Sequence, residues 1–434
     1  MSADLRRRQP TGGDHRRVGP VGLRRAGRAR ELLVAGVLDS FGMALGWTIL
    51  VLLAVSRGGL AEAALYNAAM LIGVVLSAPV TGWLARRFPG RGLLRGAAGS
   101  EMLLRVGCLA GLIAGLPSWL IGLGVIVMHV AAWVGFAAMR AEVAAVDNRP
   151  KAMTRYALAI AAIEAAGTGV GALLPVGPDG YPTGRPLIAI FVVYAGSLIP
   201  TIISSRRARM TPHGATRTIM TARILARAII RPRHRTLPTK RTFAVSPRLL
   251  TAGGAVMLVA AGPTLLAVPL TTELHGRHWV AGTAIAFSVG CLLATKAVEA
   301  IGKMRLPAVL RWSLWGLGML VGWIYAPAHA MSILMAQFLA GLSQTAFEGD
   351  MDALVAEEAA PEAITTALAY SASVRALGGS IAVKLLPMLV TAQAIDKAVS
   401  AAVLVLGVAS LLLWALTSMP WLNRRSPAEA VSGG

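Results

Sequence analysis

The stretch from Ser205 to Arg248 reads SRRARMTPHGATRTIMTARILARAIIRPRHRTLPTKRTFAVSPR. It carries twelve Lys/Arg residues and no acidic residue, and long apolar segments lie on both sides of it in nearly equal amounts. In membrane proteins, Lys and Arg collect in the loops on the cytoplasmic side. The stretch therefore predicts two membrane-embedded halves, residues 31–204 and 249–420, joined by a basic cytoplasmic loop at 205–248.

The composition of the whole chain also favours a membrane protein with many spans. Hydrophobic residues make up 56% of the 434 residues and charged residues 14%, whereas a soluble globular chain carries about 25% charged residues. Most of the net charge of +22 comes from the central loop and from residues 1–30, which hold nine Arg and two Asp. We interpret this charge as a sign of membrane topology and of contact with anionic lipid headgroups, and we expect no nucleic-acid partner.

Apolar runs of about 20 residues are long enough for a spanning helix, and they predict twelve transmembrane helices in two groups of six. A basic tail at 1–30 precedes the helices and a short tail at 421–434 follows them. Because the number of spans is even, both tails lie on the same side of the cell membrane, and the basic residues identify that side as cytoplasmic. The expected spans are 31–55, 62–84, 92–116, 118–140, 153–175, 186–204, 249–271, 279–298, 306–326, 329–348, 364–391 and 397–419.

The two halves resemble each other in sequence. Residues 139–175 and 351–387 align without a gap, and they share Gly167 with Gly379 and a closing Leu-Leu-Pro. The offset between them is about half of the chain. Parallel repeats of six helices are a known architecture of transporters, so the alignment favours two related bundles.

Two loops carry the most specific local pattern. The loop after the second expected helix reads GWLARRFPGR over residues 82–91, and the loop after the eighth reads TKAVEAIGK over 295–303. With the six-plus-six arrangement, these loops resemble the major facilitator superfamily, whose pattern is Gly, three residues, Asp, Arg, one residue and Gly, followed by basic residues. The resemblance covers about residues 31–420. It implies an all-α membrane protein of twelve transmembrane helices, in which two six-helix bundles rock about a midplane site.

The resemblance also implies a cytoplasmic gate. In the first loop the Gly and basic positions match, but Arg86 stands where the family has Asp and one residue is inserted. In the second loop the acid, second Gly and basic positions match. We expect Arg86 and its basic neighbours to pair with the acidic loop after the tenth expected helix when this side closes. The gate residues are Gly82, Arg86, Arg87, Arg91, Glu299, Gly302, Lys303, Asp350 and Asp352.

Several polar side chains fall inside the expected spans. An ionised side chain at the middle of a bilayer costs about 2.5–3.5 kcal/mol, so it needs a partner or a function. Asp39 and Glu164 are candidates for the proton-coupling acid, and structural pairing is the alternative. Glu101 and Arg105 have the four-residue spacing of an ion pair within one helix, and we assign them to structure. The candidates for proton coupling and the substrate cavity are Asp39, Glu164, Arg375, His129 and Gln337.

Other kinds of site find little support in the sequence. Glu273, His275 and His278 have a spacing seen among metal ligands, but no further ligand follows them, so we predict no metal site. The two cysteines, Cys108 and Cys291, form no motif for a disulfide framework or a metal. Motifs for ATP binding and for catalysis are missing, and we expect neither a cofactor nor an enzymatic activity.

Together these observations predict a monomeric secondary transporter with a small-molecule substrate and protons as its partners. Efflux of an amphipathic compound is favoured because the cavity helices offer many Ala, Gly, Leu and Met side chains and few charges. A glycine-rich fifth helix, here with Gly167, Gly169 and Gly171, is also found in antiporters of the family, although close helix packing explains such glycines as well. An uptake symporter of the same fold and a non-transporting scaffold or sensor are the alternatives.

Overall fold

The computed structural model describes residues 20–146, 150–174, 185–208, 246–304, 306–358 and 364–418. Most of the central basic loop and of both tails lies outside these ranges. In chain order the helices are α1 (Pro20–Arg87), α2 (Gly90–Ile113), α3 (Ser118–Val146), α4 (Pro150–Leu173), α5 (Arg185–Gly196), α6 (Ile199–Ser204), η1 (Ser205–Arg207), α8 (Pro247–Ala260), α9 (Gly262–Leu265), α10 (Ala267–His275), α11 (Trp279–Gly302), α12 (Ala308–Leu320), η2 (Val321–Tyr325), α13 (Ala330–Glu358), α14 (Ile364–Leu389), η3 (Ala392–Ala394) and α15 (Ile395–Ser418).

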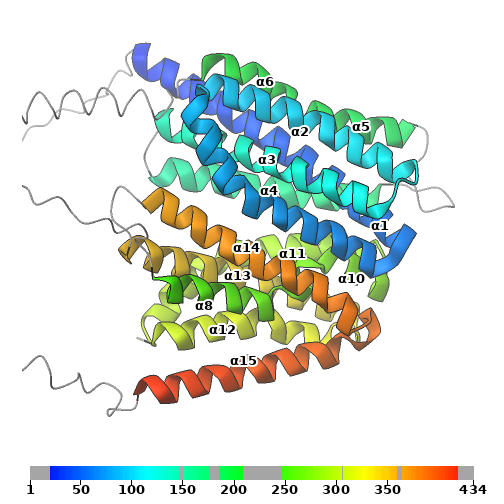
Figure 1. The fold of residues 1–434 in the computed structure, drawn as a ribbon, viewed down its shortest axis with the longest axis vertical. Coiled ribbons are helices and arrows are strands. Elements are labelled where there is room, and N and C mark those ends of the chain that lie inside the picture. Colours follow the sequence, from blue (N-terminus) through cyan, green and yellow to red (C-terminus); the bar gives the residue numbers. More distant parts are fainter. Residues whose placement is uncertain are drawn as a thin grey trace, which may run out of the picture.

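The helices form two halves that lie side by side (Figure 1). The N-terminal half contains α1 to α6, and the C-terminal half contains α8 to α15. We call the end of the molecule where the described chain begins at Pro20 and finishes at Ser418 the tail end. The opposite end, where α1 turns back, is the loop end. Both names are used below to place residues along the helices.

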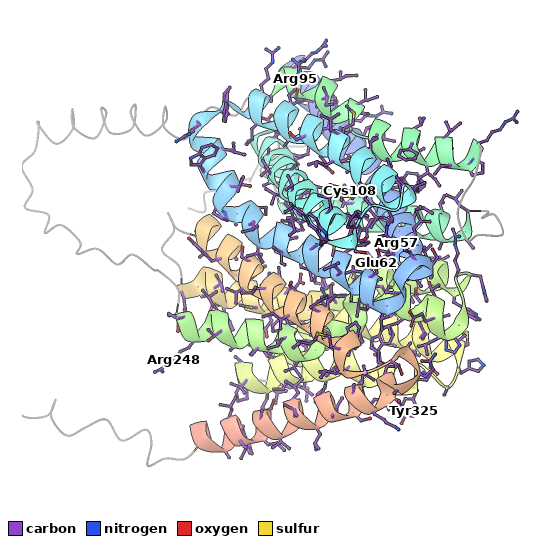
Figure 2. The ribbon with its side chains drawn as sticks, turned by 45° about the vertical axis from the view of Figure 1, so that its right-hand side comes forward. Arg57, Glu62, Arg95, Cys108, Arg248 and Tyr325 are labelled. Atoms are coloured by element: carbon purple, nitrogen blue, oxygen red, sulfur yellow. The ribbon has the colours of Figure 1, made fainter. Side chains whose placement is uncertain are left out.

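α1 is two helices joined at a kink. Gly58 and Gly59 have non-helical backbone angles, and Gly59 has a φ of 61°, a conformation that costs glycine little. Next to the kink, Arg57 and Glu62 form an ion pair with a distance of 3.3 Å between Nε and Oε1 (Figure 2). Arg57 also donates a hydrogen bond of 2.6 Å to the carbonyl of Leu116. These contacts tie the kink to the turn between α2 and α3.

Each of the twelve expected spans corresponds to a helix or to a run of helices. By length and composition, eight helical stretches in the described part of the chain are apolar enough to cross a membrane, and one of them, Gly27–Leu84, holds both spans of α1. The seventh expected span is broken into α8, α9 and α10, with Pro263 at the start of α9 and Pro269 near the start of α10. Proline lacks the backbone N–H that a helix interior requires.

Two helices extend beyond the expected spans. α1 begins at Pro20, before the first expected span at 31–55, because proline suits the first helical position and Arg, Leu and Ala are good helix formers. We expected an acidic loop after the tenth span. The structure continues α13 to Glu358, so Asp350 and Asp352 lie on a helix that the Ala, Glu, Leu and Met residues around them favour.

Glycines set the closest helix contacts. A Cβ atom on Gly290 of α11 would collide with the carbonyl oxygen of Phe338 on α13, and one on Gly341 of α13 would collide with that of Phe287 on α11. In the N-terminal half, Gly167 of α4 lies in the same way against the backbone of α1. Close approach through small residues is the usual packing of membrane helices, because lipid removes the hydrophobic drive for association.

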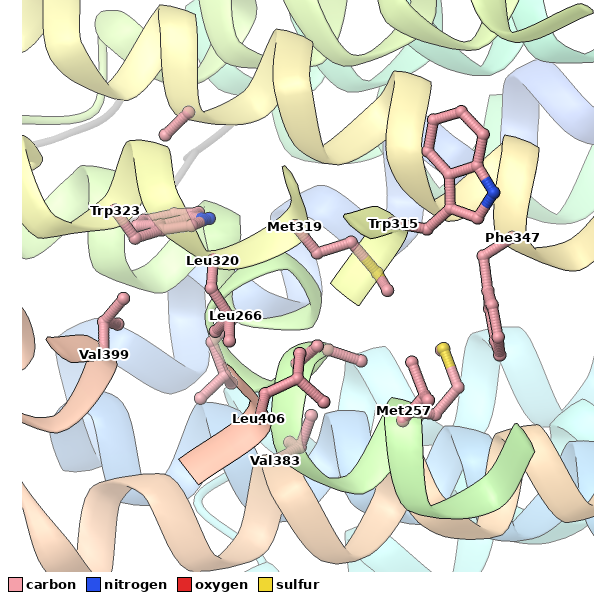
Figure 3. Packing of buried hydrophobic residues seen from close by; sticks show 14 of the residues in the cluster. Met257, Leu266, Trp315, Met319, Leu320, Trp323, Phe347, Val383, Val399 and Leu406 are labelled. Carbon is pink, nitrogen blue, oxygen red and sulfur yellow. The ribbon is translucent and has the colours of Figure 1, made fainter. Parts of the chain in front are cut away.

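The C-terminal half is held by an apolar core in which Trp, Phe and Met side chains pack among Leu and Val (Figure 3). Trp315, Met319 and Trp323 are 4%, 0% and 0% exposed. Trp312 meets Phe347 of α13 edge to face, with ring centroids 5.6 Å apart, a geometry that the charge distribution of aromatic rings favours. α12, η2 and α13 therefore pack as one unit.

Hydrogen bonds join the two halves toward the loop end. Arg277 donates to the carbonyls of Ala172 and Gly171, at 2.7 and 3.0 Å, and Glu273 accepts from the backbone N–H of Leu60. The positively charged Arg277 thus lies at the C-terminus of α4, and the negatively charged Glu273 lies at the N-terminus of the second helix of α1. The helix dipole favours both placements. Burial raises the pKa of Glu273 and lowers that of Arg277, because both groups lose water at the contact.

Gly290→Ala tests the contact between α11 and α13. The added methyl group forces the two backbones apart, and overpacking of this kind costs about 1–3 kcal/mol. We therefore expect a lower melting temperature in detergent. Gly107→Ala on α2 is the matched control, because a Cβ there meets nothing within 4 Å, and replacing a helical glycine gains about 0.5–1 kcal/mol. An unchanged melting temperature for Gly290→Ala would contradict the packing.

Arg277→Ala tests the loop-end contact. Hydrogen bonds of a charged group are worth about 1.5–3 kcal/mol, so we expect the population open at the loop end to rise about tenfold or more. The measurement is the labelling rate of a cysteine at Ala281, which lies against Gly169, by a charged maleimide in a background without Cys108 and Cys291. Arg185→Ala removes an exposed charge from the start of α5 and should leave the rate unchanged. Equal rates in both variants would rule out this role for Arg277.

Candidate functional site

A buried arginine brings together two carboxylates of the N-terminal half. Arg105 on α2 is 1% exposed, and it donates hydrogen bonds to Asp39 of α1, at 2.6 Å, and to Glu101, one turn earlier on α2. It also donates to the carbonyl of Tyr194, at 2.8 Å, and to the hydroxyl of Ser197, at 3.0 Å. The guanidinium group therefore receives partners from α1, α2 and the end of α5.

The two carboxylates differ in their surroundings. The side chain of Glu101 is 4% exposed, whereas that of Asp39 is 29% exposed. Glu101 is therefore enclosed behind Arg105, and Asp39 is the member of this trio with access to solvent. We had predicted the pair of Glu101 and Arg105 as an ion pair within one helix, and the structure forms it. The spacing gave no sign that Asp39 shares the same guanidinium group.

Glu164 lies near this trio on α4. It accepts a hydrogen bond from the hydroxyl of Ser40, the neighbour of Asp39, and its side chain is exposed. It is three residues from Gly167, which lies against α1, so Glu164 is on the α1 side of α4. Asp39 and Glu164, the two predicted proton-coupling acids, are therefore neighbours across the contact of α1 with α4.

A cavity of about 20 Å³ adjoins the trio inside the N-terminal half. It has room for a single water molecule and none for a substrate. Its lining residues are Gly36, Asp39, Ser40, Ala98, Glu101, Gly135, Phe136, Met139, Leu198 and Thr201.

The other two polar candidates on cavity helices are buried within their own halves. His129 is 4% exposed; its Nδ1 donates to the carbonyl of Val125 at 3.0 Å, and its ring meets Trp47 edge to face. Gln337 is 3% exposed, and its amide nitrogen has no hydrogen-bond partner among the described residues. The hydrogen bond described for the Asp39 carboxylate comes from Arg105 and not from either of these side chains.

Arg375 and the two gate aspartates lie at the tail end of the C-terminal half. Arg375 donates to Asp352 at 2.7 Å and to the hydroxyl of Ser371 at 2.8 Å. Arg311 binds Asp350 through two hydrogen bonds, of 3.0 and 2.8 Å. Both aspartates therefore pair within their own half in this conformation.

The remaining gate residues are spread over the tail end. Arg87 lies over the ring of Trp83, with 4.1 Å between its guanidinium carbon and the ring centroid. The side chain of Arg86 lies outside the part that the structure describes. Gly82 is half-buried on α1, and the exposed members of the set are Arg87, Arg91, Glu299, Gly302 and Lys303.

Apolar side chains of α11 are exposed on the side of this helix that contacts α4. On α11, Ile285 and Leu292 are 57% and 48% exposed, and they follow Ala281, which lies against Gly169 of α4, by four and eleven residues. This spacing puts them on the same helix face. Toward the tail end, α11 thus presents apolar side chains on the face that it turns to α4.

Among the side chains that the structure describes, no group of three or more His, Cys, Asp or Glu residues is placed to hold a metal ion. Of the loop-end residues with metal-ligand spacing, Glu273 binds the backbone of Leu60, and the Nε2 of His275 donates to the carbonyl of Ala326 at 2.8 Å. Two of these three side chains are therefore already hydrogen-bonded to backbone groups.

No protein-family model and no curated protein sequence matches the chain. Solved structures do match it. The nucleoside transporter NupG is 10% identical, with 89% of this chain and 99% of that chain covered and a TM-score of 0.64. The xylose transporter XylE from E. coli, in an inward open conformation, is 14% identical, with coverages of 90% and 95% and a TM-score of 0.61. A bacterial homologue of the iron transporter ferroportin, in an inward-facing state, is 16% identical, with coverages of 91% and 99% and a TM-score of 0.59.

Similarity at these levels of sequence identity establishes the fold of the chain and does not establish its substrate or mechanism. It extends over about nine-tenths of the chain. The chain therefore has the fold that these solved structures share, the major facilitator fold.

Proposed function

We propose that the protein is a secondary transporter that couples the inward movement of protons to the efflux of a small amphipathic compound by alternating access. The observation that carries this proposal is the pair of carboxyl groups, Asp39 and Glu164, on adjacent helices beside the buried Arg105. Membrane-embedded carboxyl groups commonly form proton relays. Asp39 and Glu101 share the guanidinium group of Arg105, and Glu164 lies beside Asp39. The cluster thus holds three carboxyl groups and one guanidinium group, so it has the charge balance to take up protons.

The carboxyl groups of α1 and α4 and the exposed apolar side chains of α11 support the substrate class. A positively charged group of a substrate could replace a proton at Asp39 or Glu164, while its apolar part contacts Ile285 and Leu292 of α11. A sugar would instead need many hydrogen-bonding side chains around it. In this scheme proton and substrate compete for the same carboxyl groups. That competition couples their movements, because each binds one state of the carrier better than the other.

The contacts between the halves support an inward-facing conformation. The hydrogen bonds of Arg277 and Glu273 hold the loop end, and we propose that the tail end faces the cytoplasm of a cell membrane, since the basic residues lie on that side. In the other conformation, Arg86, Arg87 and Arg91 would approach Asp350 and Asp352 and close the tail end. The working unit in this proposal is one chain of two bundles, residues 31–204 and 249–420.

Proton release on addition of substrate tests the coupling. We expect purified protein in weakly buffered detergent to release protons when a lipophilic cation such as tetraphenylphosphonium is added, as followed with a pH-indicator dye. Asp39→Asn or Glu164→Gln should abolish the release. Loss of a charged contact costs about 1.5–3 kcal/mol, so affinity for the cation should fall about 10-fold to 100-fold.

Glu357→Gln is the matched control, because this carboxyl group is exposed at the tail end of α13 and should leave release and affinity unchanged. Release that persists in both Asp39→Asn and Glu164→Gln would sink the proposed coupling. Binding without release in the wild type would favour a uniporter or a non-transporting protein of the same fold. Accumulation of the compound inside proteoliposomes together with protons would favour an uptake symporter.

A further inference from the structure

The water-sized cavity of the N-terminal half lies between groups that the proposed coupling uses. Asp39 and Ser40 of α1, Glu101 of α2 and Thr201 of α6 bring polar side chains to its wall. Its volume of about 20 Å³ exceeds the 10–15 Å³ or so that one water molecule requires. A water molecule in a protein interior also needs two to four polar partners, and this wall offers them.

Thr201 gives independent evidence for a ligand in the cavity. Its side chain is 3% exposed, and its hydroxyl oxygen has no hydrogen-bond partner within the described chain. Buried hydroxyls are almost always paired, commonly with the carbonyl four residues earlier in a helix. Thr48 of α1 makes that bond, to Ala44 at 2.8 Å, whereas Thr201 does not. The Thr201 hydroxyl is therefore free to bind a molecule in the cavity that it lines.

Arg105 blocks direct proton exchange between the two carboxyl groups that it binds. The same guanidinium nitrogen donates to Asp39 and to Glu101. Arginine stays protonated in proteins and accepts no hydrogen bond, so a proton cannot pass through it. A route from the accessible Asp39 to the enclosed Glu101 needs another group that both donates and accepts, and water is such a group.

We propose that the cavity binds a water molecule, held by the Thr201 hydroxyl between Asp39 and Glu101, through which a proton passes between these two carboxyl groups. The proposal rests on the proposed proton coupling. Protonated Asp39 gives its proton to the water oxygen while the water gives one of its own protons to the Glu101 carboxylate. The water is regenerated, Arg105 keeps its charge, and Glu101 stores the proton away from solvent.

Ser40 extends this route to the third carboxyl group. It lines the cavity, and its hydroxyl donates to Glu164, so one water molecule connects all three acids. The titratable and charged groups that face the water or its neighbours from the surrounding helices are Asp39 (α1), Glu101 and Arg105 (α2), His129 (α3), Glu164 (α4) and Tyr194 (α5).

Radiolytic oxidation tests the water site without any transport assay. Hydroxyl radicals formed from bound water oxidise methionines beside it. Met139 lines the cavity and is 4% exposed, while Met319, at 0%, lies in the core of the C-terminal half. We expect oxidation of Met139 but not of Met319. Thr201→Val should reduce it about fivefold to tenfold, the change that loss of one hydrogen bond produces, and Thr201→Ser should restore it. Protection of Met139 equal to that of Met319, or no effect of Thr201→Val, would overturn the site.

Stopped-flow proton release tests the relay. Thr201→Val should slow the release that tetraphenylphosphonium induces by about tenfold, with little change in affinity for the cation, and Thr201→Ser should release at the wild-type rate. Thr283→Val is the matched control, since this buried hydroxyl bonds its own helix at Val280. Wild-type rates in Thr201→Val would overturn the relay while leaving the coupling intact. Absence of release in the wild type would overturn both, and the oxidation of Met139 would still decide the water site.

Discussion

The burial of one guanidinium group is the constraint on which the N-terminal half depends. A charged side chain inside a bilayer costs about 2.5–3.5 kcal/mol even by insertion scales, and removing one partner of a buried ion pair typically costs about 3–5 kcal/mol. Hydrogen bonds from Arg105 offset this cost, and their acceptors are Asp39, Glu101, the carbonyl of Tyr194 and the hydroxyl of Ser197. Because these partners come from different helices, the helices must keep a fixed register, and a proton gained or lost by a carboxyl group changes a contact between helices.

Glycines on α1 and α4 make this register possible. A Cβ on Gly42 would collide with Ser197, and one on Gly46 would collide with the ring of Tyr194, so these two glycines bring α1 close to the segment that supplies partners to Arg105. On another side of α1, Gly167 and Gly171 of α4 lie against its backbone. α1 is therefore held by backbone-close contacts on two sides, and Asp39, one turn before Gly42, is positioned by the same packing. The glycines that resemble an antiporter motif thus serve helix packing in this conformation.

The sequence was sufficient for features that are local along the chain. Apolar runs predicted a helix or a run of helices at each expected span, because the bilayer imposes a minimum length. The four-residue spacing predicted the contact of Glu101 with Arg105. Contacts between distant segments left no such signal. Asp39 and Arg105 are 66 positions apart, and no periodic pattern links them. The pairing of Arg375 with Asp352 was not predicted for another reason. The dense run of acidic residues around Asp352 was interpreted as a loop, although its Ala, Leu, Met and Glu residues favour a helix. Thr201 was missed because an unpaired hydroxyl is visible only when its surroundings are known.

The distribution of charge between the halves has a mechanical consequence. In the C-terminal half, the ion pairs of Arg311 and Arg375 lie near the tail end. The core cluster of this half is apolar, so protonation has little to act on there. The responsive groups lie on α1 and α4, which carry Asp39 and Glu164. α4 also supplies the carbonyl groups that Arg277 binds at the loop end, and Leu60, whose backbone N–H donates to Glu273, lies just beyond the kink of α1. A change in charge at the carboxyl groups therefore acts on the loop-end contact directly through α4 and, for α1, across the kink. Proton binding in the proposed cycle can reach the contact between the halves without any rearrangement of the C-terminal core.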